Sequence, residues 1–261
     1  MNWLWMLVGT YLLYATVMVV AHSRFIYPFG PDPFDDPSFT QEIVGPREVA
    51  MALSTGEDPV AVLFFMGNGG ALAYFTFSLQ AHQTAGRTVA AIEYPGGGGI
   101  PGQASETGLK ADALTAYDWL AARHDGPIVV HGYSMGTGLA VHVAARREVA
   151  AVILDAPYVR MCELMTRASY LPACYMPFVQ KWDTARDVPR VTAPVLIQHG
   201  ESDQLIPPAN GARLADLFSD AGVRVSLQVL PGGTHNNLAG HPDYRENISG
   251  FLAQAVVVPP E

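Results

Sequence analysis

The motif Gly-x-Ser-x-Gly at residues 132–136 is the feature that most limits how this 261-residue chain can fold. An apolar run at 127–130 leads into it, and a helix-like run at 138–145 follows it. In that context the serine occupies a tight strand-to-helix turn, where only small residues fit on either side. The turn raises the Ser134 hydroxyl above a sheet edge, close to the positive end of a helix. The motif therefore predicts a nucleophilic serine; the alternative is an ordinary glycine-rich turn.

Around this turn the chain alternates between short apolar runs and helix-like patterns. The runs that predict strands are residues 60–66, 88–94, 128–131, 151–154, 195–199 and 225–230. The patterns that predict helices are about residues 72–84, 106–123, 135–146, 209–221 and 244–254. Continuous Val, Ile and Leu runs are typical of strands buried on both faces, so the alternation predicts an α/β domain with a mostly parallel sheet and helices on both faces. Residues 42–53 are predicted to add an antiparallel strand or hairpin at one edge.

Composition excludes several classes of protein. Apolar residues make up 49% of the chain, which is ample for the core of one large domain. The formal net charge of −9 argues against nucleic acid as a partner. The two cysteines, Cys162 and Cys174, are too few for a disulfide scaffold and lack metal-ligand spacing, so they are either buried thiols or one disulfide. We therefore expect no metal and no cofactor.

The first residues predict a membrane anchor. Residues 3–21 carry no charge, and a helix of that length is about 28 Å long, close to the thickness of a bilayer core. The aromatic residues that flank it, as interfacial belts do, are Trp3, Trp5, Phe25, Tyr27 and Phe29. No Lys or Arg precedes Arg24, whereas a cleaved signal peptide usually starts with basic residues. We predict a single-pass helix within residues 1–24; a cleaved signal, or a helix packed on its own domain or on a partner subunit, are the alternatives.

A proline-rich stretch separates this helix from the rest of the chain. Residues 28–37 can form neither a helix nor a central strand because prolines recur through them. We expect residues 25–40 to be a linker and residues 41–256 to be the α/β domain.

Two further strand ends carry groups that could act with the serine. In a parallel sheet, active groups gather in the loops at the carboxyl ends of the strands. Asp203 follows the predicted strand at 195–199, and His235 follows the one at 225–230. His235 would act as general base toward Ser134, and Asp203 would fix the imidazole tautomer. The sequence leaves Asp155 as an alternative acid.

Two other histidines lie near the predicted site in the sequence. His241 is an alternative base, although it lies where the chain turns into the last helix. His131 precedes the serine within a predicted strand and is expected to be a packed core residue.

A glycine-rich loop predicts the remaining part of an acyl-transfer site, the oxyanion hole. Residues 67–71 follow the predicted strand at 60–66, and small residues there leave backbone N–H groups accessible. We assign one donor to the N–H of Asn68 and the other to the N–H of Met135. Gly67 or Gly69 could replace Asn68 as the donor, and a merely flexible loop is the remaining alternative.

Taken together, these motifs resemble the α/β-hydrolase superfamily. The similar stretches are residues 66–69, 93–96, 101–109, 132–136, 199–207 and 233–236. They are most similar to the small, often membrane-anchored serine hydrolases of the abhydrolase-domain type, which include acylglycerol lipases and protein depalmitoylases. The resemblance implies an α/β-hydrolase fold, the triad Ser134, Asp203 and His235, and the oxyanion hole of Asn68 and Met135.

The sequence departs from the family pattern at two places. Met66 stands where the family usually has His, and a glycine run at 96–99 replaces the usual Arg-Gly-aromatic-Gly-x-Ser loop. The run predicts a wider and more mobile pocket rim. Substrate preference therefore does not carry over from relatives, although the type of reaction does.

Residues 157–192 fit no core element and are predicted to form a short lid over the serine. Their flexible Met and large aromatic side chains suit an adaptable apolar pocket. We expect Met161 and Met165 in the lid, together with Gly67 and Tyr133, to contact the substrate.

These features predict a membrane-anchored serine hydrolase that cleaves carboxylic esters or thioesters with apolar acyl groups through an acyl-enzyme. The expected partners are a small ester or lipid substrate and the membrane itself. A peptidase or amidase of the same fold, or a non-catalytic binding protein, are the alternatives.

Overall fold

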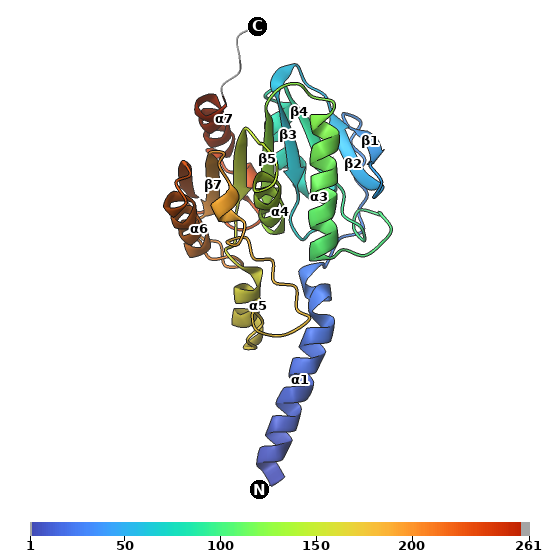
Figure 1. Cartoon of the computed structure of the whole chain (residues 1–261), viewed down its shortest axis with the longest axis vertical. Helices are drawn as coiled ribbons and strands as arrows, with labels where there is room; N and C mark the ends of the chain where they lie inside the picture. Colours follow the sequence, from blue (N-terminus) through green and yellow to red (C-terminus); the bar gives the residue numbers. More distant parts are fainter. Residues whose placement is uncertain (1, 257–261) are drawn as a thin grey trace.

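Within residues 2–256, which the computed structural model describes, eight strands form one central sheet (Figure 1). The strands are β1 (Thr40–Val44), β2 (Val49–Ser54), β3 (Asp58–Phe65), β4 (Arg87–Ile92), β5 (Ile128–Tyr133), β6 (Ala151–Asp155), β7 (Val195–Gly200) and β8 (Val225–Leu230). Their order is β1-β2-β4-β3-β5-β6-β7-β8. All neighbours from β4 to β8 pair parallel, which confirms the predicted mostly parallel sheet.

Helices cover both faces of this sheet. The α-helices are α1 (Asn2–Ile26), α2 (Thr76–Gln83), α3 (Glu106–Ala121), α4 (Met135–Ala144), α5 (Met161–Ser169), α6 (Ala209–Asp220) and α7 (Tyr244–Ala255). Figure 1 shows α3 and α4 in front of the strands. On β5 and β6, His131 contacts His82 of α2 and Asp155 contacts Tyr244 of α7, so these two helices share a face.

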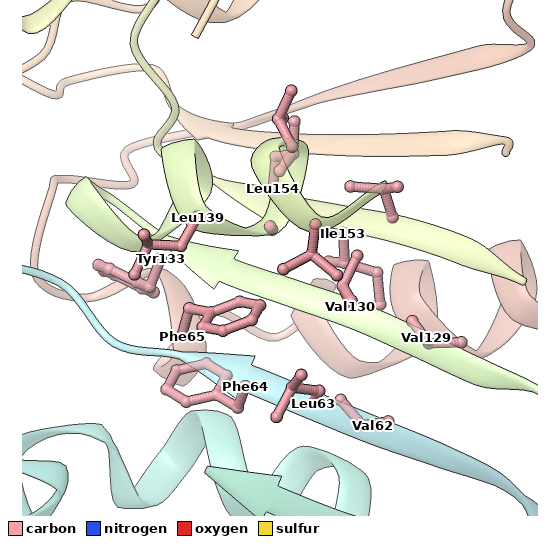
Figure 2. Packing of buried hydrophobic residues seen from close by; sticks show 14 of the residues in the cluster. Val62, Leu63, Phe64, Phe65, Val129, Val130, Tyr133, Leu139, Ile153 and Leu154 are labelled. Carbon is pink, nitrogen blue, oxygen red and sulfur yellow. The ribbon is translucent and has the colours of Figure 1, made fainter. Parts of the chain in front are cut away.

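Side chains of the central strands β3, β5 and β6 are buried on both faces of the sheet (Figure 2). Leu139 of α4, which packs on one of these faces, is fully buried. Strand β8 is different, because it has only β7 as a neighbour and most of its residues are half-buried or exposed. The expectation that every strand is buried on both faces is therefore wrong for this edge strand.

Residues 42–53 form the expected edge hairpin of β1 and β2, which pair antiparallel, and β2 in turn pairs with β4. The helix predicted over residues 72–84 begins with a 3₁₀ turn, Leu72–Phe75, before α2. Such turns are common at helix starts, where the first N–H groups lack intrahelical partners.

The N-terminal helix α1 projects from the domain and contacts it only with its second half (Figure 1). The hydroxyl of Tyr14 donates to the carbonyl of Ser169, 2.9 Å away, and His22 Nε2 accepts from the N–H of Gln180 at 3.2 Å. The segment that follows α1 is bonded to the domain. Gly30 pairs with the glycine loops, donating to the Gly69 carbonyl and accepting from the Gly98 N–H.

The lid segment forms a small unit beside α1. It contains α5, a short bridge between Arg160 and Asp183, and a disulfide between Cys162 and Cys174. The disulfide decides between the two alternatives left open for the cysteines. Around it lies a minor apolar cluster that includes Val179 and is separate from the main core.

Candidate active site

Ser134 occupies the tight turn between β5 and α4. Its backbone has φ 50° and ψ −115°, a conformation that is strained for a residue with a side chain. A Cβ at Gly132 would clash with the carbonyl of Gly136, and a Cβ at Gly136 would clash with the carbonyl of Phe65. Both glycines are therefore required by the close approach of backbone that the motif predicts. The Ser134 N–H donates to the carbonyl of Asp155 at 2.8 Å, which fixes the turn to the neighbouring strand.

Hydrogen bonds link the side chains of Ser134, His235 and Asp203 in that order. His235 Nε2 is 2.9 Å from Ser134 Oγ, and His235 Nδ1 is 2.7 Å from Asp203 Oδ2. All three residues are buried. An imidazole that donates from Nδ1 to a carboxylate leaves Nε2 free to accept the serine proton, as general-base chemistry requires.

The carboxylate of Asp203 is held in its charged form. Its Oδ1 accepts the N–H groups of Leu205 and Ile206, each at 2.9 Å. Burial alone would raise the pKa of Asp203, but hydrogen bonds from His199 and His235 outweigh it and hold the pKa well below its ordinary value. These contacts therefore favour the ionised form of Asp203 beside the imidazole.

The alternative acid and base make other contacts, although His241 lines the same pocket as Ser134. Asp155 accepts hydrogen bonds from His131 Nε2 at 2.8 Å, from the Tyr244 hydroxyl at 2.5 Å and from Gln198 Nε2 at 3.3 Å, so its carboxylate already has three side-chain donors. The ring of His241 lies 3.2 Å from the Pro231 carbonyl. His131 is a fully buried residue, as expected for a core histidine. No group of three or more His, Cys, Asp or Glu within residues 2–256 is arranged to hold a metal ion.

The glycine loop lies directly beside the serine. A Cβ at Gly67 would be 3.3 Å from the Cβ of Ser134, so the loop packs closely against the serine side chain. In the described chain, the backbone N–H groups of Asn68, Gly69 and Met135 donate to no protein acceptor. They are available to a ligand oxygen, and so is the N–H of Gly67, so Gly67, Asn68 and Gly69 all remain candidates for the second donor.

A pocket of about 630 Å³ opens above Ser134 and His235. Gly67 and Tyr133, which are predicted to contact the substrate, line it. The other apolar and aromatic walls are Tyr74, Phe75, Phe77 and Leu205. Sequence reasoning misses Tyr74, Phe75 and Phe77 because the pattern of residues 72–84 predicts a helix that packs on the core.

Met161 and Met165, which are predicted to contact the substrate, lie away from the pocket beside Ser134. Met161 packs against the main core, and Met165 faces a groove of about 280 Å³ between the lid and α1. The physical reason is that the lid is held toward α1, through Tyr14 and Ser169, rather than across the serine.

Three features define a serine hydrolase of the α/β-hydrolase fold. They are the strand order of the sheet, the strained turn at Ser134, and the hydrogen bonds that link Ser134, His235 and Asp203. Comparison with known proteins agrees. The chain belongs to the dienelactone hydrolase family, whose sequence model matches residues 101–250.

Individual relatives are named for related activities or have none assigned. An uncharacterised protein of Mycobacterium tuberculosis is 32% identical over 188 residues, 70% of this chain and 65% of the relative. The lysophosphatidylserine lipase ABHD12 of Xenopus tropicalis is 27% identical over 219 residues, 73% of this chain and 57% of that protein. The chain thus spans about half to two thirds of the length of these relatives.

Solved structures show the same fold. The Pyrococcus furiosus esterase Pf2001 superposes with a TM-score of 0.72 at 16% identity, over 87% of this chain and 97% of the esterase. The Thermogutta terrifontis esterase Est2 gives a TM-score of 0.64 at 20% identity, over 88% and 96%. At this identity the likeness concerns the fold alone.

Proposed function

We propose that the protein is an ester hydrolase that acts on carboxylic esters or thioesters with an apolar acyl group, through an acyl-enzyme on Ser134. The observation that carries the proposal is the hydrogen-bonded sequence of Ser134 Oγ, His235 and Asp203, at 2.9 and 2.7 Å. The esterases among the structural neighbours and the lipase among the relatives support the same type of reaction.

The proposed reaction follows from these positions. His235 Nε2 takes the proton of Ser134 as its Oγ attacks the carbonyl carbon, and Asp203 stabilises the imidazolium. The oxyanion that forms is held by the N–H groups of Met135 and of Asn68 in the glycine loop. Collapse expels the leaving group, which takes the proton from His235. Water then attacks the acyl-enzyme by the same steps and regenerates the serine.

The pocket supports an apolar, uncharged acyl group. Phe75, Phe77 and Leu205 form its walls, and no Lys, Arg, Asp or Glu is among the described residues that line it. A peptidase that recognises a charged terminus or side chain would need such a group close to the serine. This composition favours ester hydrolysis over the peptidase or amidase alternative.

We further propose that α1 is a single-pass membrane anchor. The candidate span, Trp3–Ile26, contains 24 residues and is almost entirely exposed on the domain's exterior. It is long enough to cross a bilayer core of about 30 Å. If α1 stays uncleaved and spans the membrane, it holds the pocket close to lipid substrates.

A series of p-nitrophenyl esters from acetyl to decanoyl tests the proposed reaction. Each buried CH₂ contributes about 0.8 kcal/mol, so kcat/KM should rise several-fold from acetyl to medium chains. Ser134→Ala should abolish turnover and fluorophosphonate labelling, because loss of a triad member costs about 10⁴-fold or more. An alanine variant with wild-type folding that still labels fully would refute the nucleophile.

A further inference from the structure

The tip of the lid, residues 167–178, exposes three aromatic side chains. Tyr170, Tyr175 and Phe178 are each 90% exposed, more than any other large hydrophobic side chain of the described residues. Tyr170 and Phe178 also have positive φ values, 58° and 63°, a region that aromatic residues rarely adopt. Such a group of exposed aromatic side chains is unusual on a surface that contacts only water, and it is typical of an interaction site.

The lid itself holds these side chains outward. The disulfide of Cys162 and Cys174 closes the loop after α5. Lys181 Nζ then donates to the carbonyls of Ala173 and Met176, at 2.7 and 2.5 Å. The aromatic tip is therefore built on a tied loop.

The tip reaches far along α1. Tyr14 contacts Ser169 at 2.9 Å, and Tyr14 lies twelve residues, about 18 Å, before the end of α1 at Ile26. A spanning helix places about 20 residues in the bilayer core. Whichever 20 residues of Trp3–Ile26 are chosen, Tyr14 lies about 12 Å or more below the surface on the domain side if the helix stands upright. The residues around Ser169 must then enter the lipid as well.

The distribution of charged residues also favours contact between the lid and the membrane. The chain has 24 Asp and Glu and a net charge of −9. None of these acids lies in α1 or in residues 164–182, where the only charged residues are Arg24, Arg167 and Lys181. An acid-free surface with three cations attracts anionic headgroups, and Tyr is enriched at the bilayer interface.

We propose that the lid tip, residues 167–178, is a lipid-docking surface that enters the interface of an anionic bilayer beside α1. The inference rests on the proposed role of α1 as an anchor. Two attachments, α1 and the tip, then fix the orientation of the domain on the membrane. The apolar groove of about 280 Å³ between them, lined by Met18, Phe25 and Met165 among others, faces lipid chains rather than water.

Depth-dependent quenching tests the proposal on the full chain. Phe178→Trp is placed in a Trp3→Phe, Trp5→Phe background and reconstituted into vesicles of seven parts phosphatidylcholine to three parts phosphatidylglycerol. Phosphatidylcholine brominated near the headgroup should quench the new tryptophan by at least half. The matched control is Ile43→Trp, because Ile43 is also exposed, at 67%, but lies on the edge strand β1. It should show no added quenching.

A second pair of variants reads the functional effect. Tyr175→Glu with Phe178→Glu should lower hydrolysis of a lipid ester in these vesicles several-fold and leave a short soluble ester unchanged. Ile43→Glu should change neither. If the tryptophan introduced by Phe178→Trp is not quenched, the docking surface is overturned, including the case in which a second copy of the chain covers the tip.

Failure of the underlying proposals would look different. Flotation of the full chain with vesicles reports on the anchor, and turnover of the soluble ester reports on hydrolysis. A chain that floats and turns over the ester, but whose introduced lid tryptophan remains unquenched, contradicts only the lid inference.

Discussion

At the scale of single residues, two buried aspartates at neighbouring strand ends have separate tasks. Asp203 faces His235, whereas Asp155 ends a chain of polar contacts that leads from Arg87 through His82 and His131. Burial, together with the neighbouring His131 and Arg87, lowers the pKa of His82 well below its ordinary value. His82 therefore stays uncharged, and the inner chain supports the strand that carries the serine.

Exchanging each aspartate for asparagine separates the two tasks. Asp203→Asn should lower kcat/KM by about 10³- to 10⁴-fold with the fold intact, because the histidine tautomer is lost. Asp155→Asn should mainly lower the free energy of unfolding, by roughly 3–5 kcal/mol, since it breaks a buried charged network. Ester kinetics and thermal melts on both variants measure this. The opposite ranking in kcat/KM would assign the acid to Asp155.

Glu93 gives the protein a pH-dependent weakness. Its carboxyl is buried, its Oε1 has no hydrogen-bond partner within the described chain, and burial raises its pKa to about 7. Between the ordinary pKa of about 4.5 and this value, the unfolded chain releases a proton that the folded chain keeps, so stability falls as pH rises and levels off above about 7. Glu93→Gln should raise Tm by several degrees at pH 8 and hardly at pH 4. A rise of equal size at both pH values would contradict the buried-acid explanation.

How much of the site was predictable depends on how local each part is. The turn around Ser134 and the order of Asp203 and His235 could be read because each stands at a strand end, and parallel strands bring those ends together. The polar chain from His82 to Asp155 could not, since it needs contacts between α2, β5 and β6 that no local pattern shows.

At the scale of elements, the lid is the part whose position follows from distant contacts. Strands were predictable because buried strands have continuous apolar runs. The lid has no such pattern, and its direction is set by Tyr14 and Ser169, which are 155 residues apart. An amphipathic, Met-rich segment looks the same whether it covers a pocket or packs beside a helix, so the sequence could predict a lid but not the surface it covers.

The disulfide should stabilise this element locally. Closing the loop between Cys162 and Cys174, a separation of 12 residues, is worth about 3 kcal/mol. Cys162→Ser with Cys174→Ser should therefore speed amide exchange across residues 161–179 by about 100-fold. Exchange in β3 and β5 should stay unchanged. Hydrogen exchange followed by mass spectrometry measures both, and unchanged protection of the lid would show that the bond is dispensable there.

At the scale of the whole molecule, the disulfide and the proposed anchor together predict on which side of the membrane the domain lies. Disulfides persist in oxidising compartments and are rare in the cytosol. With α1 as an anchor, the domain that carries Cys162 and Cys174 should lie on the non-cytoplasmic face. Added protease should digest the domain in right-side-out vesicles and spare it in inside-out vesicles. Protection in the first and digestion in the second would place the domain in the cytoplasm.

The connection at Gly30 has a consequence for how such an enzyme meets its substrate. A flexible linker would let the catalytic domain take many orientations relative to the membrane and reach substrate in the surrounding solution. Here Gly30 is hydrogen-bonded to the loops at Gly69 and Gly98, and Phe29 packs against Gly70, so the end of α1 is fixed to the domain by direct contacts. With α1 in a bilayer, the mouth of the pocket stays at a fixed height. Encounters would then depend on two-dimensional diffusion in the plane of the leaflet, and the surface density of substrate, rather than its bulk concentration, would set the rate.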